Sequence, residues 1–362
     1  MKLKNIAIAF LGALLFTTCS KKDDEKEYTA EESKAVVRNT MNNFYDCLKN
    51  LNDGGFANFF HDLLFKETVR DHRGETQSWG NFLGEKFDKQ NFAEGLTEGD
   101  RFNYHRMKGT YTWNKNTELW EKTANNENVT FIFPATKGAT NNGKLVIDQY
   151  EDTETTYRND KVYLPTAAHL YATIDNTKVF EVTVKNVTFE KKTNFTMPLS
   201  AHISIYTNPF TTTIQWNRQN PENFVFDFAF SSPQGCTTGL HADIKLTTSD
   251  YGNISSLEKA IDKIAFTATQ GELRIVGNID VKSLEEKGND RKLRVEEINT
   301  YAKAVLMKGN SKIADVKYEE ENDKGVIYFI FSDGSREKAE SYVSDFQDRV
   351  TEIFKRFERE NN

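Results

Sequence analysis

Apolar and polar residues alternate along much of the segment from residue 105 to residue 250. The clearest run is FVFDFAF, which places Phe224, Phe226, Phe228 and Phe230 on one face of an extended strand. Similar runs, separated by turn residues, occur at residues 111–113, 129–133, 180–184 and 201–205. A parallel sheet would need helices between its strands, and no helical pattern separates these runs. The sequence therefore predicts a large antiparallel meander over residues 105–250.

Helical patterns precede this region, over residues 29–104. Thr29 and Glu32 have the spacing of a capping box, in which each residue satisfies a backbone N–H of the other. Apolar residues then recur at helical spacing, at Val37, Met41, Phe44, Leu48 and Leu51. Two further apolar stripes begin at Phe56 and Trp79. We therefore expect residues 29–104 to form a helical segment.

Residues 251–362 combine both patterns. They predict a capped helix over residues 255–264, a strand at 272–281, a helix at 295–305, and a strand pair at 313–318 and 326–331. After Asp333 and Gly334, a last helix is expected from an apolar stripe of Tyr342, Val343, Phe346, Val350, Ile353, Phe354 and Phe357. Such a stripe must dock on another element, so we expect it to pack on the sheet or on the N-terminal helices, with Phe346, Val350 and Phe354 buried.

Together these patterns predict an α+β fold. N-terminal helices precede a large antiparallel meander, flat or curved into a half-barrel, and a C-terminal helix packs on it. The mixed region is expected to form one unit with the sheet. A chain of 362 residues is long enough for one large domain or two smaller ones.

The N-terminus has the layout of an export leader. A basic start with Lys2 and Lys4 is followed by an uncharged apolar run, Ile6 to Phe16, and then by Cys19. The run is shorter than the ~20 apolar residues that a membrane-spanning helix needs. The stretch resembles a bacterial lipoprotein signal, and its loose residues before the cysteine resemble those of the Bacteroidota. The resemblance implies that residues 1–18 are removed and that Cys19 is acylated.

A burst of charge follows the cysteine, comprising Ser20, Lys21, Lys22, Asp23, Asp24 and Glu25. This stretch resembles the export signal of flavobacterial lipoproteins, which implies display on the outer face of the outer membrane. The alternative interpretation is a solvated linker, because such a charge run cannot bury itself. On either interpretation residues 19–28 form a charged tether, and the partner implied is the membrane, through the lipid anchor.

Composition and motifs exclude several function classes. The net charge of −7 gives no basic footprint for nucleic acid. HExxH, GxSxG, GxxxxGK[ST] and GxGxxG are all absent, and the histidines lack metal-ligand spacing. The acidic residues from Asp148 to Glu154 fit a solvated loop better than the paired carboxylates of a glycosidase. We therefore expect no enzyme activity, no cofactor and no metal.

Cys47 and Cys236 are the cysteines that remain after Cys19. In an exported protein they could form one disulfide. They lie far apart in the sequence, and Cys47 falls in a predicted helix, which favours the alternative of two buried thiols.

The function expected is therefore binding or assembly at the cell surface, with a glycan, a host protein or a partner complex as ligand. We expect exposed loops of the sheet to carry the binding residues, among them Trp120 and Trp216, which lie near amide side chains. An aromatic face beside amides suits a sugar ring or a peptide. Each tryptophan could equally be the inward end of a strand. Two other functions remain open. One is a carrier that holds a lipid or other amphiphile on the aromatic face of a curved sheet, and the other is a hydrolase whose site no short motif reveals.

Overall fold

The structure is a computed structural model that describes residues 27–70, 74–95, 97–98, 101–157, 160–190, 197–250, 254, 257–289, 291–343, 351–352 and 355–357. Cys19 and the charged stretch Ser20 to Glu25 lie outside the described residues, as do Phe346, Val350 and Phe354 of the expected last helix. The chain divides into two compact units. Unit 1 comprises Met1–Lys49 and Thr212–Glu352, and unit 2 comprises Asn50–Thr211 and Ile353–Asn362.

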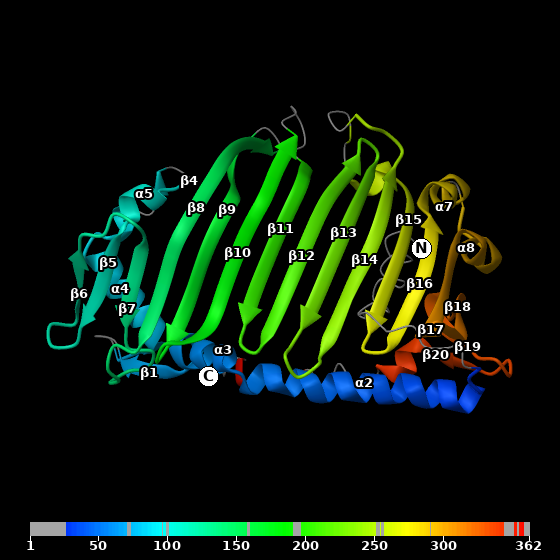
Figure 1. The fold of residues 1–362 in the computed structure, drawn as a ribbon, viewed down its shortest axis with the longest axis horizontal. Coiled ribbons are helices and arrows are strands. Elements are labelled where there is room, and N and C mark those ends of the chain that lie inside the picture. Colours follow the sequence, from blue (N-terminus) through cyan, green and yellow to red (C-terminus); the bar gives the residue numbers. More distant parts are fainter. Residues whose placement is uncertain are drawn as a thin grey trace. The chain divides into compact units, whose positions relative to one another are not determined.

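A sheet of 16 strands dominates the described part of the chain, so the expected α+β fold with a large, mainly antiparallel sheet is confirmed (Figure 1). Consecutive strands are neighbours almost throughout, which is the order of a meander. The exception is β7, which pairs in parallel with β5. The packing of a C-terminal helix on this sheet is not part of what the described residues establish.

The strands of unit 2 follow the order β11-β10-β9-β8-β7-β5-β6. Their bounds are β5 Gly109–Asn114, β6 Leu119–Thr123, β7 Val129–Phe133, β8 Gly143–Tyr157, β9 Asp160–Ile174, β10 Thr177–Glu190 and β11 Met197–Thr207. The helical elements are α3 Gly55–Phe60, the π-helix η1 His61–Phe65, α4 Trp79–Lys89, α5 Tyr104–Met107, and the 3-10 turns η2 Ala93–Gly95 and η5 Lys355–Phe357. Two short strand pairs interrupt the segment expected to be helical: β1 Glu67–Arg70 with β2 Thr76–Ser78, and β3 Thr97–Glu98 with β4 Arg101–Phe102.

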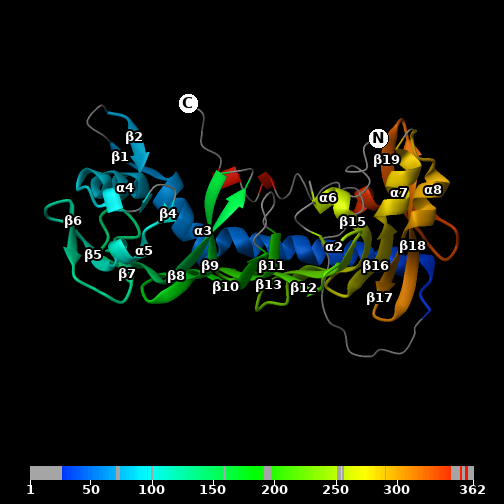
Figure 2. The same ribbon diagram turned by 90° about the horizontal axis from the view of Figure 1, so that it is seen from above.

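The strands of unit 1 follow the order β20-β19-β18-β17-β16-β15-β14-β13-β12. Their bounds are β12 Phe210–Asn220, β13 Asn223–Ser231, β14 Thr237–Leu246, β15 Ile261–Gln270, β16 Leu273–Asp280, β17 Ala302–Lys308, β18 Ser311–Glu321, β19 Lys324–Ile330 and β20 Arg336–Lys338. The helical elements are α2 Ala30–Asp53, α6 Leu257–Ala260, α7 Val281–Gly288, α8 Val295–Tyr301 and the 3-10 turn η4 Ala339–Tyr342. Seen from above, α7 and α8 lie beside the strands β15 to β18 that they contact (Figure 2).

The predicted boundaries of three helices in the C-terminal region were wrong. The helix expected to run to Ile264 ends at Ala260, and the helix expected to run to Val305 ends at Tyr301. In both places the chain passes directly into a strand, β15 or β17, whose ladder bonds to its neighbours replace the helical ones. The last helix does not start after Gly334, because residues there form β20 and then η4.

The N-terminal helix α2 confirms its sequence prediction. The backbone N–H of Thr29 donates to Glu32 Oε2 at 2.9 Å, and the N–H of Glu32 donates to Thr29 Oγ1 at 3.2 Å. Val37, Met41 and Phe44 of the predicted stripe are buried. Val37 belongs to the main core of unit 1, which the apolar residues of β14 to β19 complete.

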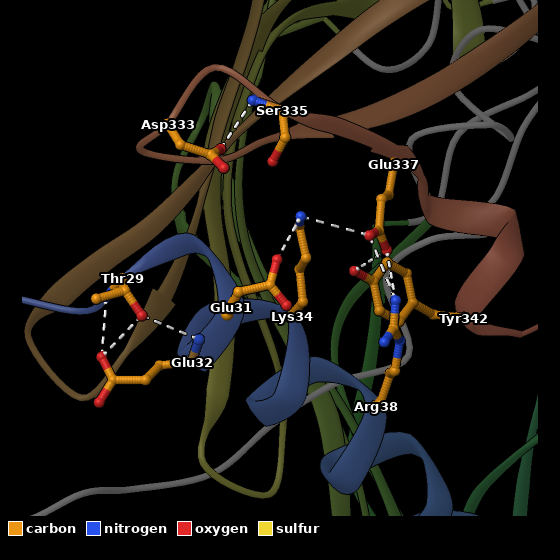
Figure 3. A network of polar contacts seen from close by, with 9 residues as sticks. All are labelled: Thr29, Glu31, Glu32, Lys34, Arg38, Asp333, Ser335, Glu337 and Tyr342. Carbon is orange, nitrogen blue, oxygen red and sulfur yellow. Dashed lines mark hydrogen bonds and ion pairs between the residues drawn. The ribbon is translucent and has the colours of Figure 1, made fainter.

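A polar network, shown in Figure 3, and a disulfide bond hold α2 within unit 1. Near its start, Arg38 Nη2 donates to Glu337 Oε2 at 3.1 Å, and Lys34 Nζ lies 3.7 Å from Glu337 Oε1. Near its end, Cys47 forms a disulfide with Cys236, with the two Cα atoms 6.0 Å apart. The disulfide alternative was therefore the correct one for these two cysteines. It joins α2 to the turn between β13 and β14.

Candidate functional site

The sheet of unit 1 has one apolar face and one polar face. Residues paired across neighbouring antiparallel strands point to the same face, and successive residues of one strand alternate between faces. Phe224 pairs with Ile244, and Phe226 pairs with Ala242, so these residues share the apolar face. The intervening residues of β13 and β14 form the polar face. Three successive cross-strand rows on it are Asn223-Lys245-Lys263, Val225-Asp243-Ala265 and Asp227-His241-Thr267.

A hollow of about 370 Å³ lies over β13, β14 and β15. Its lining comprises Gln219, Asn223, Phe224, Val225, Asp243, Ile244, Lys245, Lys263 and Ala265. Most of these residues belong to the first two rows of the polar face, so the hollow opens on that face. Val225 and Ala265 are short side chains in the middle row, and the longer lysines stand in the neighbouring row. This difference in side-chain length accounts for the depression.

Two lysines form one wall of the hollow, and each is held by a carboxylate. Lys245 and Lys263 are direct cross-strand partners. Like charges placed opposite one another are destabilising, so this pair needs compensation. Lys245 Nζ lies 3.1 Å from Asp262, and Lys263 Nζ lies 3.3 Å from Asp280. The register of β14 and β15 shifts after Lys245, and Asp262 is the residue skipped by that bulge, which lets its side chain reach Lys245.

Asp280 is itself fixed by the helix that follows it. Its Oδ1 accepts a hydrogen bond from the backbone N–H of Ser283 at 3.0 Å, so Asp280 is the N-cap of α7. Burial favours the neutral form of Asp280, but the hydrogen bonds from Ser283 and Lys263 outweigh burial and lower the pKa of this carboxyl. A carboxylate held ionised at this position keeps Lys263 in place at the wall of the hollow.

His241 stands in the third row, beside the hollow. Its Nδ1 lies 2.7 Å from Asp227 Oδ1, and its Nε2 lies 3.5 Å from Asp243 Oδ2. The hydrogen bond with Asp227 is the main cause that raises the pKa of His241, and burial opposes it. In its protonated form the ring links Asp227 on β13 to Asp243, which lines the hollow.

This arrangement is suited to binding through side chains. The lining offers two ammonium groups, one carboxylate and two amides above an aliphatic floor. It contains no hydroxyl or thiol side chain that could act as a nucleophile. Among the residues that the structure describes, no group of three or more His, Cys, Asp and Glu side chains is arranged to hold a metal ion.

A second histidine of unit 2 is held in a similar way. His169 on β9 lies between Asp148 on β8, at 2.7 Å from Nδ1, and Glu181 on β10, at 3.1 Å from Nε2. Both ring nitrogens thus have carboxylate partners, which ties three adjacent strands together. Lys178 also contacts Glu181, at 2.6 Å. This group forms a closed set of ion pairs, with no ring nitrogen left to act as a base.

The acidic cluster of residues 148–154 lies in the strand β8, where we had expected a loop. Asp148 pairs with His169, as described above. Asp152 accepts hydrogen bonds from Arg101 at 3.0 and 3.2 Å, and Glu154 pairs with Lys161 at 2.9 Å. His169 and Lys161 lie on the adjacent strand β9, and Arg101 lies on β4 of the separate two-stranded sheet, so these three carboxylates hold strands of unit 2 together.

The structure does not bring the predicted ligand-binding residues together. Trp120 lies in β6 in the core of unit 2, 6% exposed, and its indole N–H donates to the carbonyl oxygen of Leu83 at 2.9 Å. Trp216 lies in β12 of unit 1, half-buried, with its ring 4.8 Å from the ring of Phe224. Both are strand residues, which is the inward-facing alternative that the sequence left open. Neither occupies an exposed loop.

The sequence patterns did not identify the residues that line the hollow as a binding site. They occupy the polar positions of the same alternating strands whose apolar positions were recognised, as in HADIKL. That alternation could have indicated an open polar face. The hollow itself depends on the cross-strand register and on the bulge at Asp262. No pattern within a single strand reveals either feature.

No helix in the described part of the chain is both long enough and apolar enough to cross a bilayer. Comparisons with protein-family models, with curated proteins and with solved structures found no match to this chain. The function must therefore be argued from the residues themselves.

Proposed function

We propose that the protein is a lipid-anchored binding module of the outer membrane, displayed on the cell surface, and that its ligand occupies the hollow over β13–β15. The ligand is an extracellular glycan or a partner protein. The N-terminal support comes from sequence: the apolar run, Cys19 and the charged stretch resemble a surface lipoprotein signal. Acyl chains contribute about 0.8 kcal/mol per buried CH₂, so several chains hold a folded body at a membrane without a spanning helix.

One observation carries the choice of site. The hollow presents charged and amide side chains on a sheet whose strands are paired on both sides, and its charged groups are fixed by ion pairs before any ligand arrives. Groups that are already ordered lose little conformational entropy on binding. The arrangement of fixed polar groups around an aliphatic floor is typical of sites that recognise a ligand.

The carrier alternative has less support. It needs an open cavity above the aromatic face, yet Phe224 is 1% exposed and its ring packs against Trp216. Phe226 packs against the main core of unit 1. These contacts are those of rings that stabilise the sheet.

A steric block tests the proposal. We expect a panel of extracellular glycans and proteins to yield a ligand for the full chain, purified in mild detergent. Ala265→Trp fills the floor of the hollow at an exposed position and should abolish binding. The matched control is Val276→Trp, which adds the same ring at an exposed position on the same face, outside the lining, and should bind normally.

A hydrolase screen of the same samples distinguishes the enzyme alternative. Turnover of any substrate that survives Ala265→Trp would contradict a non-catalytic role and place the chemistry elsewhere. Binding that is equal in both variants would place the ligand site outside the hollow.

A further inference from the structure

The accessible charge at the wall of the hollow is positive, although each lysine is paired. The side chain of Lys245 is 49% exposed, whereas that of its partner Asp262 is 15% exposed. The side chain of Lys263 is 58% exposed, whereas that of Asp280 is 26% exposed. The ammonium groups are thus more accessible to solvent than the carboxylates that pair with them. A ligand that enters the hollow can therefore contact two adjacent cations whose counter-ions are less accessible.

The remaining polar groups favour hydroxyls. Asp243 lines the hollow one row away from the lysines, two residues along β14 and so about 7 Å distant along the strand. Its carboxylate repels an anion and accepts hydrogen bonds from hydroxyl groups. The amides of Gln219 and Asn223 can donate and accept. The site therefore orients a ligand that carries an anionic group at one end and hydroxyl groups at the other.

The position of the hollow argues against a peptide. Extended peptides bind sheets by adding a strand at a free edge, through main-chain hydrogen bonds. β14 pairs with β13 and with β15 along its length, and β15 also pairs with β16. The backbone groups of these strands are used within the sheet, so recognition here must come from side chains. The volume of about 370 Å³ is near the small end of ligand sites, which suits a short stretch of a polymer.

From this geometry we infer that the hollow binds an acidic polysaccharide, with a sugar carboxylate held by Lys245 and Lys263 and ring hydroxyls held by Asp243. This inference rests on the proposed binding function and names its ligand class. Charge-assisted hydrogen bonds to two ammonium groups give the carboxylate its affinity. Because both lysines are about half exposed, salt screens the attraction, and binding weakens as ionic strength rises.

The experiment compares polygalacturonate with the same polymer after its carboxylates have been reduced to hydroxymethyl groups. The full chain, purified in mild detergent, is titrated with each polymer at low and at physiological ionic strength. We expect polygalacturonate to bind about tenfold or more tightly than the reduced polymer at low salt, and this preference to shrink as salt is added.

The variant Lys245→Gln/Lys263→Gln should abolish the preference for the acidic polymer. The matched control is Lys317→Gln, which removes an exposed lysine from β18 of the same unit, outside the hollow, and should retain the preference. Circular dichroism and thermal melting of the double variant check that it folds. If it does not, Ala265→Trp replaces it: filling the hollow should abolish the preference, and Val276→Trp should retain it.

Two results would overturn the inference. Equal binding of both polymers, lost in Ala265→Trp, would show that the hollow binds neutral sugars, and the proposed binding function would stand. Absence of binding to either polymer would refute the acidic-polysaccharide assignment. The wider panel with Ala265→Trp would then decide separately whether the hollow binds anything else.

Discussion

His169 shows how a single side chain can tie three strands of unit 2 together. Burial lowers the pKa of its imidazole, but the hydrogen bonds to Glu181 and Asp148 outweigh burial, and the net effect raises the pKa. In the protonated form both ring N–H groups donate to carboxylates. The ordinary pKa of histidine in an unfolded chain is about 6.5.

The raised pKa makes stability depend on pH. The contribution of His169 is fully present below its unfolded pKa of about 6.5, and it is lost as pH rises through the higher folded value. The free energy of unfolding should therefore fall as pH rises above about 6.5, and it should fall less in His169→Gln. Urea denaturation at several pH values measures this. His241 is present in both proteins, so the difference between them isolates His169, and parallel curves would contradict the assignment.

Trp120 is a core residue, and its removal should act on stability. Trp120→Ala deletes a buried ring together with its hydrogen bond to Leu83, and such truncations cost about 3–5 kcal/mol. Trp216→Ala removes a half-buried ring from β12 and should cost clearly less. Thermal melting of the two variants provides the comparison. Equal small losses would mean that the indole of Trp120 is not packed as described.

The two tryptophans also show what sequence can predict for single residues. Both were proposed as exposed loop residues, and both lie in strands, whereas alternation identified the apolar positions of β13 correctly. It could not say which side of a strand is covered. For Trp120, the covered side of the strand is set by α4, which contains Leu83. Leu83 and Trp120 are 37 positions apart in the sequence, so a local pattern does not reveal this contact.

At the scale of elements, α2 is fastened near both ends. Lys34 and Arg38 pair with Glu337 near the start, and Tyr342 donates to the same carboxylate at 2.6 Å (Figure 3). Cys47 is joined to Cys236 near the end. The Arg38 side chain is exposed, so solvent screens its ion pair with Glu337, and such pairs contribute little individually. The disulfide, which closes a separation of 189 residues, is therefore the stronger fastening.

Removing the disulfide should lower stability by about 2–4 kcal/mol, because the unfolded chain regains conformational freedom. The comparison is urea denaturation of the wild type with and without reductant, alongside Cys47→Ala/Cys236→Ala. Reductant should bring the wild type to the stability of the double variant and leave the variant unchanged. A wild type that is insensitive to reductant would show that the two cysteines are not bonded in solution.

Elements differ in how well their sequence predicts them. α2 carries a capping box and a long apolar stripe, and it forms where expected. α8 ends early because its Asn299 side chain bonds the backbone of Tyr318, donating to the carbonyl at 2.7 Å and accepting from the N–H at 2.9 Å. The chain then joins the sheet as β17. Such competition between a helix and a distant strand is not visible in a local pattern.

At the scale of the whole molecule, unit 1 is assembled from distant parts of the chain. Its core combines Ala30 and Val37 with residues of β14 to β19. The helical, sheet and mixed ranges expected from sequence follow the order of the chain, whereas the compact units do not. The change from helical to alternating spacing along a chain shows where one kind of element gives way to another. It gives no information on which distant elements pack together, such as α2 and the last strands of unit 1.

Acyl chains on Cys19 should anchor the protein to the membrane through its N-terminus. We expect mass spectrometry of the mature protein to find Cys19 as the first residue, carrying acyl chains. The reason is the order of apolar run, cysteine and charge in the sequence. Cys19→Ala should release the protein from the membrane fraction or leave its leader uncleaved. A mature wild-type protein that begins at another residue and carries no lipid would contradict this prediction.

The charged stretch should decide on which face of the membrane the protein is displayed. Replacing Lys21, Lys22, Asp23, Asp24 and Glu25 with alanine should leave the protein folded and lipidated but absent from the cell surface. The stretch precedes α2, which begins at Ala30, and is too polar to join a core, so its loss should not disturb the fold. Protease digestion of intact cells measures surface exposure.

The matched control for that variant is Lys26→Ala/Glu27→Ala, which removes one positive and one negative charge from the same tether, outside the stretch that resembles an export signal. It should be digested like the wild type. If digestion of all three proteins is equal, the charged stretch is only a spacer. If both variants are lost from the surface, the requirement is for charge anywhere in the tether. Loss confined to the first variant, with Cys19 lipidated in every protein, identifies Lys21 to Glu25 as the determinant of display.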